Sequence, residues 1–156
     1  MQIKEKYDRP LYYIEYIGSF EVSRIQVDSG SALSIMPRRV MQHLGIPAHQ
    51  LSATQTTIYS FNTNGTRTMG KIKLKCQIED LKSEVTCYVI DTDTSSNLLL
   101  GCLWIYRNFI IPYTLHQVMK YVNEGEIRTL IVEKYLFKGV ELLYELPPLS
   151  RLPRNC

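Results

Sequence analysis

The chain has 156 residues, a length that suits one domain with a modest core. Hydrophobic residues make up 45% and charged residues 21%, which is typical of a globular protein and excludes a disordered one. A net charge of +3 without a run of five like charges argues against nucleic-acid binding, and no apolar stretch reaches the roughly 18 residues of a membrane span.

The first part of the chain alternates short strands with turns. Two strands, Leu11–Ile17 and Phe20–Val27, are joined by Gly18-Ser19, a pair suited to a tight hairpin. A short strand over residues 32–36 and a short helix over 37–45 follow, because proline suits the first turn of a helix and glycine its end.

The second part continues this pattern. A hairpin is predicted from residues 56–61 and 66–76, and a strand over 85–90 comes before a polar loop at 91–97. A short helix is expected after Gly101, and residues 126–132 suit another strand. Short strands with frequent turns and few helices predict a mainly β domain.

The chain carries cysteine and histidine without the spacing of a metal site or of a serine or cysteine triad, so no metal and no cofactor are predicted. Residues 1–9 are polar and charged rather than a secretory signal, and reduced thiols fit an intracellular compartment. The residues concerned are Cys76, Cys87, Cys102, Cys156, His43, His49 and His116.

The most informative motif is Asp28-Ser29-Gly30, which ends the apolar run Ile25-Gln26-Val27. Burying an unpaired carboxylate is costly, and acids in perturbed environments cluster at functional sites. The tripeptide alone is also a common turn sequence, because Asp and Ser bond nearby backbone and Gly accepts a positive φ. Its context therefore has to decide between a site and an ordinary turn.

That context is supplied by the hairpin at 56–76 and by Leu99-Leu100-Gly101, where an apolar run stops at a glycine and restarts with helical spacing. In this order, the three segments resemble a retropepsin-type aspartic protease, the peptidase of retroviruses and long-terminal-repeat retrotransposons. The resemblance is strongest to proteases of plant Ty3/gypsy-type elements and covers roughly residues 10–122. It also rests on Ser31-Ala32, Ile35-Met36-Pro37, Tyr88-Val89-Ile90-Asp91, Trp104-Ile105, Thr114-Leu115-His116-Gln117 and Met119-Lys120.

The resemblance implies a closed, barrel-like β fold with one or two short helices and a β-hairpin flap. It divides the chain into an N-terminal linker at 1–9, a retropepsin-like domain at 10–122 and a C-terminal extension or linker at 123–156. The secondary structure of this last segment is left open. Residues 116–122 are a candidate for the strand that joins two copies.

The resemblance also implies a catalytic mechanism. Aspartic proteases use two carboxylates and one water, and two adjacent carboxyls cannot both ionise. This chain has a single Asp-Ser-Gly, so the second aspartate must come from a second copy in a homodimer. Asp28 is the predicted catalytic residue, and Ser29, Gly30 and Ser31 are predicted to support its loop.

Two further sets of residues follow from the resemblance. The first set forms the flap and contacts substrate, although a plain surface hairpin is the alternative interpretation of that segment. The second set packs behind the catalytic loop as core. The flap residues are Tyr59, Phe61, Asn62 and Gly65, and the backing residues are Leu99, Leu100 and Gly101. Many retroviral proteases carry an acid where this chain has Ala32.

Three functional hypotheses remain open. The first is an aspartic endopeptidase that matures a retrotransposon polyprotein, in the cytoplasm or in virus-like particles, with peptide or polyprotein as its substrate. The second is a catalytically inactive retropepsin-like domain that only dimerises or binds peptides. The third is a cellular retropepsin of the ubiquitin-shuttle type, although no ubiquitin-like segment is present.

Overall fold

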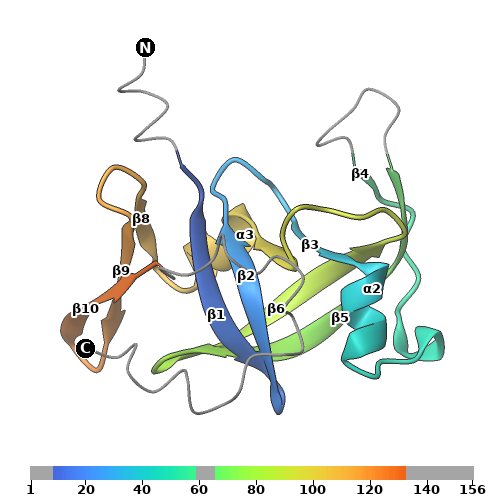
Figure 1. Cartoon of the computed structure of the whole chain (residues 1–156), viewed down its shortest axis with the longest axis horizontal. Helices are drawn as coiled ribbons and strands as arrows, with labels where there is room; N and C mark the ends of the chain where they lie inside the picture. Colours follow the sequence, from blue (N-terminus) through green and yellow to red (C-terminus); the bar gives the residue numbers. More distant parts are fainter. Residues whose placement is uncertain (1–8, 59–65, 133–156) are drawn as a thin grey trace.

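The computed structural model describes residues 9–58 and 66–132. Its fold is mainly β, with two short α-helices in the described part of the chain (Figure 1). The elements are β1 (Leu11–Ile17), β2 (Phe20–Val27), β3 (Ser34–Pro37), α2 (Arg38–His43), the 3₁₀ turn η1 (Ala48–Gln50), β4 (Thr57–Ile58), β5 (Thr66–Ile78), β6 (Leu81–Ile90), β7 (Leu98–Leu100), α3 (Cys102–Arg107), β8 (Ile111–Tyr113), β9 (Val118–Asn123) and β10 (Glu126–Ile131).

Six of these strands close into a barrel, as expected for the predicted fold class. Their order is β1-β2-β7-β3-β6-β5, and a second pairing of β5 with β1 closes the circle. Closure satisfies the backbone groups that an open sheet would leave at its edges. The interior is filled by apolar side chains from every strand of the barrel, among them Leu11, Ile25, Met36, Val89 and Leu100.

The β1–β2 hairpin has the predicted bounds, and Gly18 makes its turn with a φ of +61°. A β-bulge interrupts its pairing, because Ser23 and Arg24 on β2 face Ile14 alone on β1. Arg24 has a φ of +56°, a left-handed backbone that is uncommon for a residue other than glycine. No local sequence pattern predicts this bulge.

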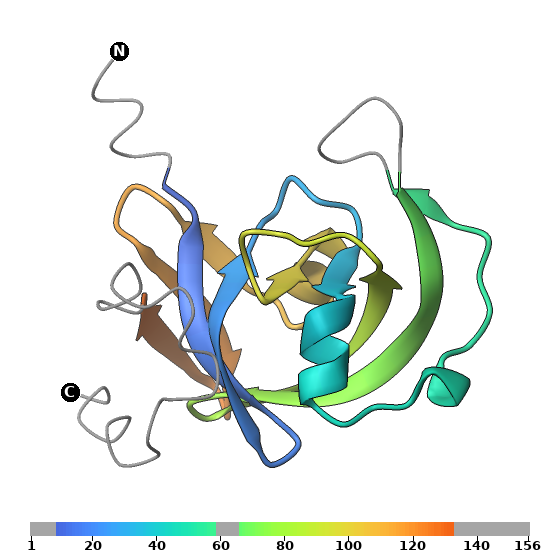
Figure 2. The same cartoon turned by 45° about the vertical axis from the view of Figure 1, so that its right-hand side comes forward.

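Two parallel pairings bring the second half of the barrel against the first. β7 runs parallel to β2, and β3 runs parallel to β6. β3 also meets β7 in antiparallel orientation through Ile35 and Leu99. The helices pack beside these short strands, α2 against β3 and β6 and α3 against β3 (Figures 1 and 2). The carboxyl ends of the neighbouring strands β2 and β7 therefore lie side by side, with Val27 opposite Leu100.

A three-stranded sheet of β8, β9 and β10 lies outside the barrel. β9 is its middle strand and pairs with β8 on one side and with β10 on the other. The β10 side of β9 is paired along the whole strand and the β8 side over Val118–Lys120, so β9 has little free backbone to pair with a strand from a second copy. The Tyr13 hydroxyl of β1 donates to the carbonyl of Leu130 at 2.7 Å and ties the sheet to the barrel.

The predicted flap residues Tyr59, Phe61, Asn62 and Gly65 lie outside the described residues. The described strands on either side, β4 and β5, pair through Thr57–Arg67 and Ile58–Thr66. The proposed limits at 1–9, 10–122 and 123–156 stay predictions. Among the residues that the structure describes, no helix is long and apolar enough to cross a membrane.

Candidate active site

Asp28 lies at the carboxyl end of β2, where the strand passes into a tight turn. Its backbone N–H donates to the carbonyl of Leu100 on β7 at 3.0 Å, and its own carbonyl accepts from the N–H of Ser31 at 3.2 Å. Its Oδ1 accepts from the N–H of Gly30 at 2.9 Å. The backbone of β7 and the turn thus fix a half-buried carboxylate at the end of a strand.

Ser31 and Ser34 connect this turn to the start of α3. The Ser31 hydroxyl donates to the carbonyl of Leu33 at 2.8 Å, and the Ser31 carbonyl accepts from the N–H of Cys102 at 2.6 Å. The Ser34 hydroxyl, which is buried, accepts from the N–H of Gly101 at 3.0 Å. The loop after Asp28 is therefore bonded on one side to β7 and on the other to α3.

Gly101 occupies a position that has no room for a side chain. A Cβ at this residue would lie 2.4 Å from the carbonyl oxygen of Leu33 and 2.6 Å from that of Ser31. Those oxygens belong to the backbone of the loop that follows Asp28, so they cannot move aside independently of the loop. Gly101 thus permits the close approach of α3 to the Asp28 turn.

Leu99 and Leu100 point to opposite sides of β7 and pack into different clusters. Leu100 is fully buried in the barrel core. Leu99 belongs to a second, smaller cluster with Ile35, Ile58 and Ile90. Because Ile58 lies on β4, this second cluster connects the strand behind the Asp28 turn to the described base of the β4–β5 hairpin.

The predicted site residues therefore divide into two groups. The structure brings Asp28, Ser31, Leu100 and Gly101 together through backbone contacts, whereas Ser29 is exposed at the tip of the turn. The catalytic and supporting roles of these residues stay predictions. The turn after β2, the end of β4 and the start of β5 lie at the same end of the molecule in both views (Figures 1 and 2).

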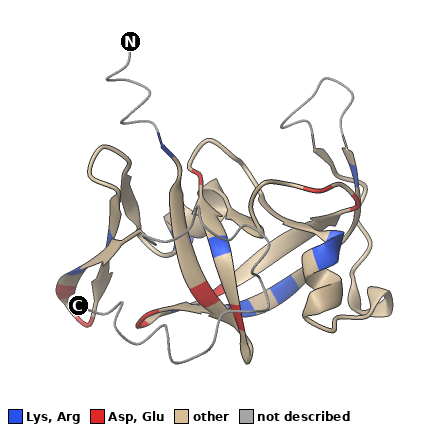
Figure 3. Cartoon of the chain, viewed as in Figure 1, with Lys and Arg blue, Asp and Glu red and all other residues tan. Residues whose placement is uncertain are grey.

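The charges of the described residues do not define another site. In Figure 3, basic and acidic residues are spread over the strands and α2 rather than gathered on one element. Within residues 9–58 and 66–132, no group of three His, Cys, Asp or Glu side chains is placed to hold a metal ion.

A polar pocket of about 350 Å³ lies between α2 and the β6–β7 loop, lined by Arg38, Arg39, Gln42, Asp91, Thr92 and Asp93.

Sequence reasoning missed the residues that organise this last region. The sequence predicts residues 91–97 only as a polar loop. Asp91 and Asp93 are indeed exposed, but Asn97 is only 2% exposed and is bonded to two other elements. No local pattern marks such contacts, because the partners of Asn97, Arg39 and Ser23, lie 58 and 74 residues before it in the chain.

Comparison with known proteins supports the fold. No family model and no curated protein matches the chain. Among solved structures, the retroviral protease-like domain of Ddi1 from Leishmania major matches with a TM-score of 0.62 and 19% sequence identity, over 80% of this chain and 94% of that domain. The EIAV protease in complex with the inhibitor HBY-793 matches with a TM-score of 0.50 and 12% identity, over 64% and 88%. The chain has a retropepsin-like fold.

Proposed function

We propose that this chain is an aspartic endopeptidase that works as a homodimer, with Asp28 from each copy forming the catalytic pair. The observation that carries the proposal is the Asp28 turn, which presents a carboxylate at the end of a strand in a retropepsin-like fold. Each chain offers only one Asp-Ser-Gly, so a pair of such carboxylates requires two copies related by a two-fold axis.

The proposed reaction is hydrolysis of a peptide bond. Two carboxyls about 3 Å apart share one proton, because like charges at that distance cannot both ionise. The ionised Asp28 takes a proton from a water molecule, whose oxygen attacks the carbonyl carbon of the substrate. The protonated Asp28 of the other copy polarises the carbonyl oxygen, and the amine leaves after it receives a proton. The enzyme forms no covalent intermediate.

We further propose that the substrate is the polyprotein of a Ty3/gypsy-like, plant-type retrotransposon. The support for this role is the set of sequence motifs that resemble those proteases, from Val27 to Lys120. Cleavage of such a polyprotein would take place inside the cell, in the cytoplasm or in virus-like particles. The catalytic step itself does not depend on this biological role.

The test is cleavage of a mixed peptide library between pH 4 and 7 at high protein concentration. The unaltered chain is compared with Asp28→Asn, which keeps the size of the side chain but cannot act as a base. We expect cleavage to fall by about 10³-fold or more in the variant, because the general base and the general acid are both removed. The rate for the unaltered chain should rise faster than linearly with its concentration.

Two results would contradict the proposal. Equal cleavage by both proteins would mean that Asp28 is not catalytic. Absence of cleavage by either protein, together with a dimer in sedimentation, would favour a retropepsin-like domain that only dimerises or binds peptides.

A further inference from the structure

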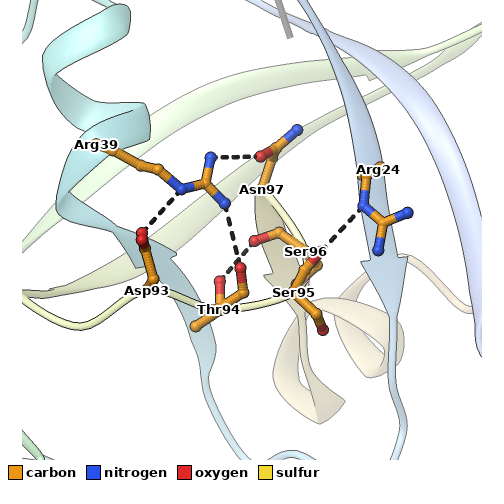
Figure 4. A network of polar contacts seen from close by, with 7 residues as sticks. All are labelled: Arg24, Arg39, Asp93, Thr94, Ser95, Ser96 and Asn97. Atoms are coloured by element: carbon orange, nitrogen blue, oxygen red, sulfur yellow. Dashed lines mark hydrogen bonds and ion pairs between the residues drawn. The ribbon is translucent and has the colours of Figure 1, made fainter. Parts of the chain in front are cut away.

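The guanidinium of Arg39 makes three contacts with the loop between β6 and β7, residues 91–97 (Figure 4). Arg39 of α2 donates to Oδ1 of Asp93 at 2.9 Å, to the carbonyl of Thr94 at 3.2 Å and to Oδ1 of Asn97 at 2.7 Å. The planar fork of arginine suits such simultaneous bonds, which a lysine ammonium on its flexible stem cannot reproduce. One side chain thus contacts the middle and the end of the loop.

The bulged part of β2 holds the same loop from the other side. The backbone carbonyl of Arg24 accepts from the N–H of Asn97 at 3.0 Å. The Nε of the Arg24 side chain donates to the carbonyl of Ser95 at 3.0 Å. The carbonyl of Ser23 accepts from Nδ2 of Asn97 at 2.7 Å. A bulge turns backbone groups away from the regular ladder, which makes them available to this loop.

Asn97 is the residue on which both sides converge. It is 2% exposed, and its side-chain carbonyl, side-chain amide and backbone N–H are all engaged. The next residue, Leu98, begins β7, which pairs with β2 and ends at Leu100. The carbonyl of Leu100 is the acceptor for the N–H of Asp28. A continuous set of contacts therefore runs from Arg39 through Asn97 and β7 to the Asp28 turn.

We infer that Arg39 is a positioning residue for Asp28, because it holds Asn97 and so fixes the β7 strand that supports the Asp28 turn. Its effect on catalysis rests on the proposed protease function, whereas its effect on the backbone does not. The bond to Asn97 carries this role. The ion pair with Asp93 contributes little, since the two side chains are 41% and 79% exposed.

The neighbouring arginine provides a matched control. Arg38 precedes Arg39 on α2 and also pairs with an aspartate of the loop, Asp91, at 3.3 Å. Its side chain is 47% exposed, and its hydrogen bonds in the described structure go to Asp91 alone. Arg38→Ala therefore removes the same charge from the same helix without touching Asn97. Asp93→Asn weakens the exposed ion pair and leaves the Arg39–Asn97 bond in place.

The decisive measurement is amide hydrogen exchange of the full chain, resolved at Asp28 and at Leu98–Leu100. We expect Arg39→Ala to speed exchange at these amides by about ten-fold or more, because a hydrogen bond from a charged donor to a buried acceptor is lost. Exchange in β9, outside the barrel, should stay unchanged. Arg38→Ala and Asp93→Asn should leave the exchange at Asp28 as it is.

If Arg39→Ala does not fold, Arg39→Lys replaces it, and the faster exchange at Asp28 should persist because lysine restores the charge but not the fork. Unchanged exchange at Asp28 in the Arg39 variant that folds would overturn the inference. A uniform increase over the whole chain would also overturn it, since that pattern indicates general destabilisation.

Kinetics separate this inference from the proposed function. With a peptide that the unaltered chain cleaves, Arg39→Ala should lower kcat by about ten-fold and leave KM near its original value, because a misplaced catalytic group affects the reaction step. Arg38→Ala should change neither value. If the unaltered chain cleaves no peptide and the exchange at Asp28 still responds to Arg39 alone, the proposed function fails and the positioning role stands.

Discussion

Two carboxylic acids of the β1–β2 region, Glu15 and Asp28, lie in opposite surroundings. Glu15 is on β1 in the middle of the barrel and is 0% exposed. Neither of its oxygens has a hydrogen-bond partner among the described residues, and the Cys76 thiol lies beside it. Asp28 is at the end of β2, half-exposed, and accepts from the N–H of Gly30.

The difference shows that two acids of one hairpin can lie in unlike surroundings, only one of which suits the proposed catalytic role. Burial raises the pKa of Glu15 to about 8, so this group holds its proton at neutral pH and is sealed from substrate. The pKa values of the adjacent Cys76 and Cys87 thiols are also raised, chiefly by burial and further by Glu15. Glu15 therefore acts on stability, whereas Asp28 is half-exposed, as its proposed catalytic role requires.

The first prediction concerns the stability of the barrel against pH. The pKa of Glu15 is raised from its ordinary 4.5 to about 8 on folding, so the folded chain binds this proton more tightly than the unfolded chain. The stabilisation by protonated Glu15 is complete below pH 4.5 and is lost as pH rises towards 8. The free energy of unfolding should fall by on the order of a few kcal/mol over this range. Urea denaturation between pH 4.5 and 8.5 measures how the free energy of unfolding changes with pH. The groups around Glu15 are Val22 on β2, Cys76 on β5 and Cys87 on β6.

Glu15→Gln isolates that effect, because the amide has a similar shape but does not titrate in this range. The slope over this pH window should disappear in Glu15→Gln and persist in Glu84→Gln, where the substituted residue is exposed on β6. Asp28→Asn should keep the slope as well. A slope that survives in Glu15→Gln would show that another group is responsible.

The second prediction concerns the glycine behind the Asp28 loop. Gly101→Ala should lower the free energy of unfolding by about 1–3 kcal/mol, because the new Cβ would overlap the backbone oxygens of Leu33 and Ser31. Equilibrium urea denaturation measures the loss. Unchanged stability in this variant would mean that the loop can move away from α3 at little cost, which would contradict its described fixation by Cys102 and Ser34.

The third prediction concerns the glycine within the Asp28 turn. A Cβ at Gly30 would lie 3.2 Å from Oδ1 of Asp28, a side-chain atom that can shift by a few tenths of an ångström. Gly30→Ala should therefore change stability by no more than about 0.5 kcal/mol. It should still slow peptide cleavage by about ten-fold, because the carboxylate is displaced. Full activity in a folded Gly30→Ala would show that this displacement does not matter.

Sequence patterns predicted much of the barrel because its signals are local. The hairpin of Leu11–Ile17 and Phe20–Val27 has the expected bounds, and the helix expected over 37–45 forms as Arg38–His43 with Val40, Met41 and Leu44 buried. The strand expected over 85–90 is longer, Leu81–Ile90, because it pairs along its whole length with β5.

Long-range features could not be predicted in the same way. The bulge at Ser23 and Arg24 depends on a loop more than 70 residues later, and the burial of Glu15 follows from closure of the barrel by β5. The bonding of Arg39 to Asn97 likewise joins residues 58 positions apart in the chain. Each of these depends on contacts that no sequence window contains.

The most direct test of a shared Asp28 pair mixes the unaltered chain with Asp28→Asn at constant total concentration. If each active dimer needs Asp28 from both copies, activity follows the square of the unaltered fraction, so an equal mixture retains roughly a quarter of full activity. Activity that falls in proportion to the unaltered fraction, to about half in the same mixture, would mean that one chain contains a complete site and would contradict the proposal.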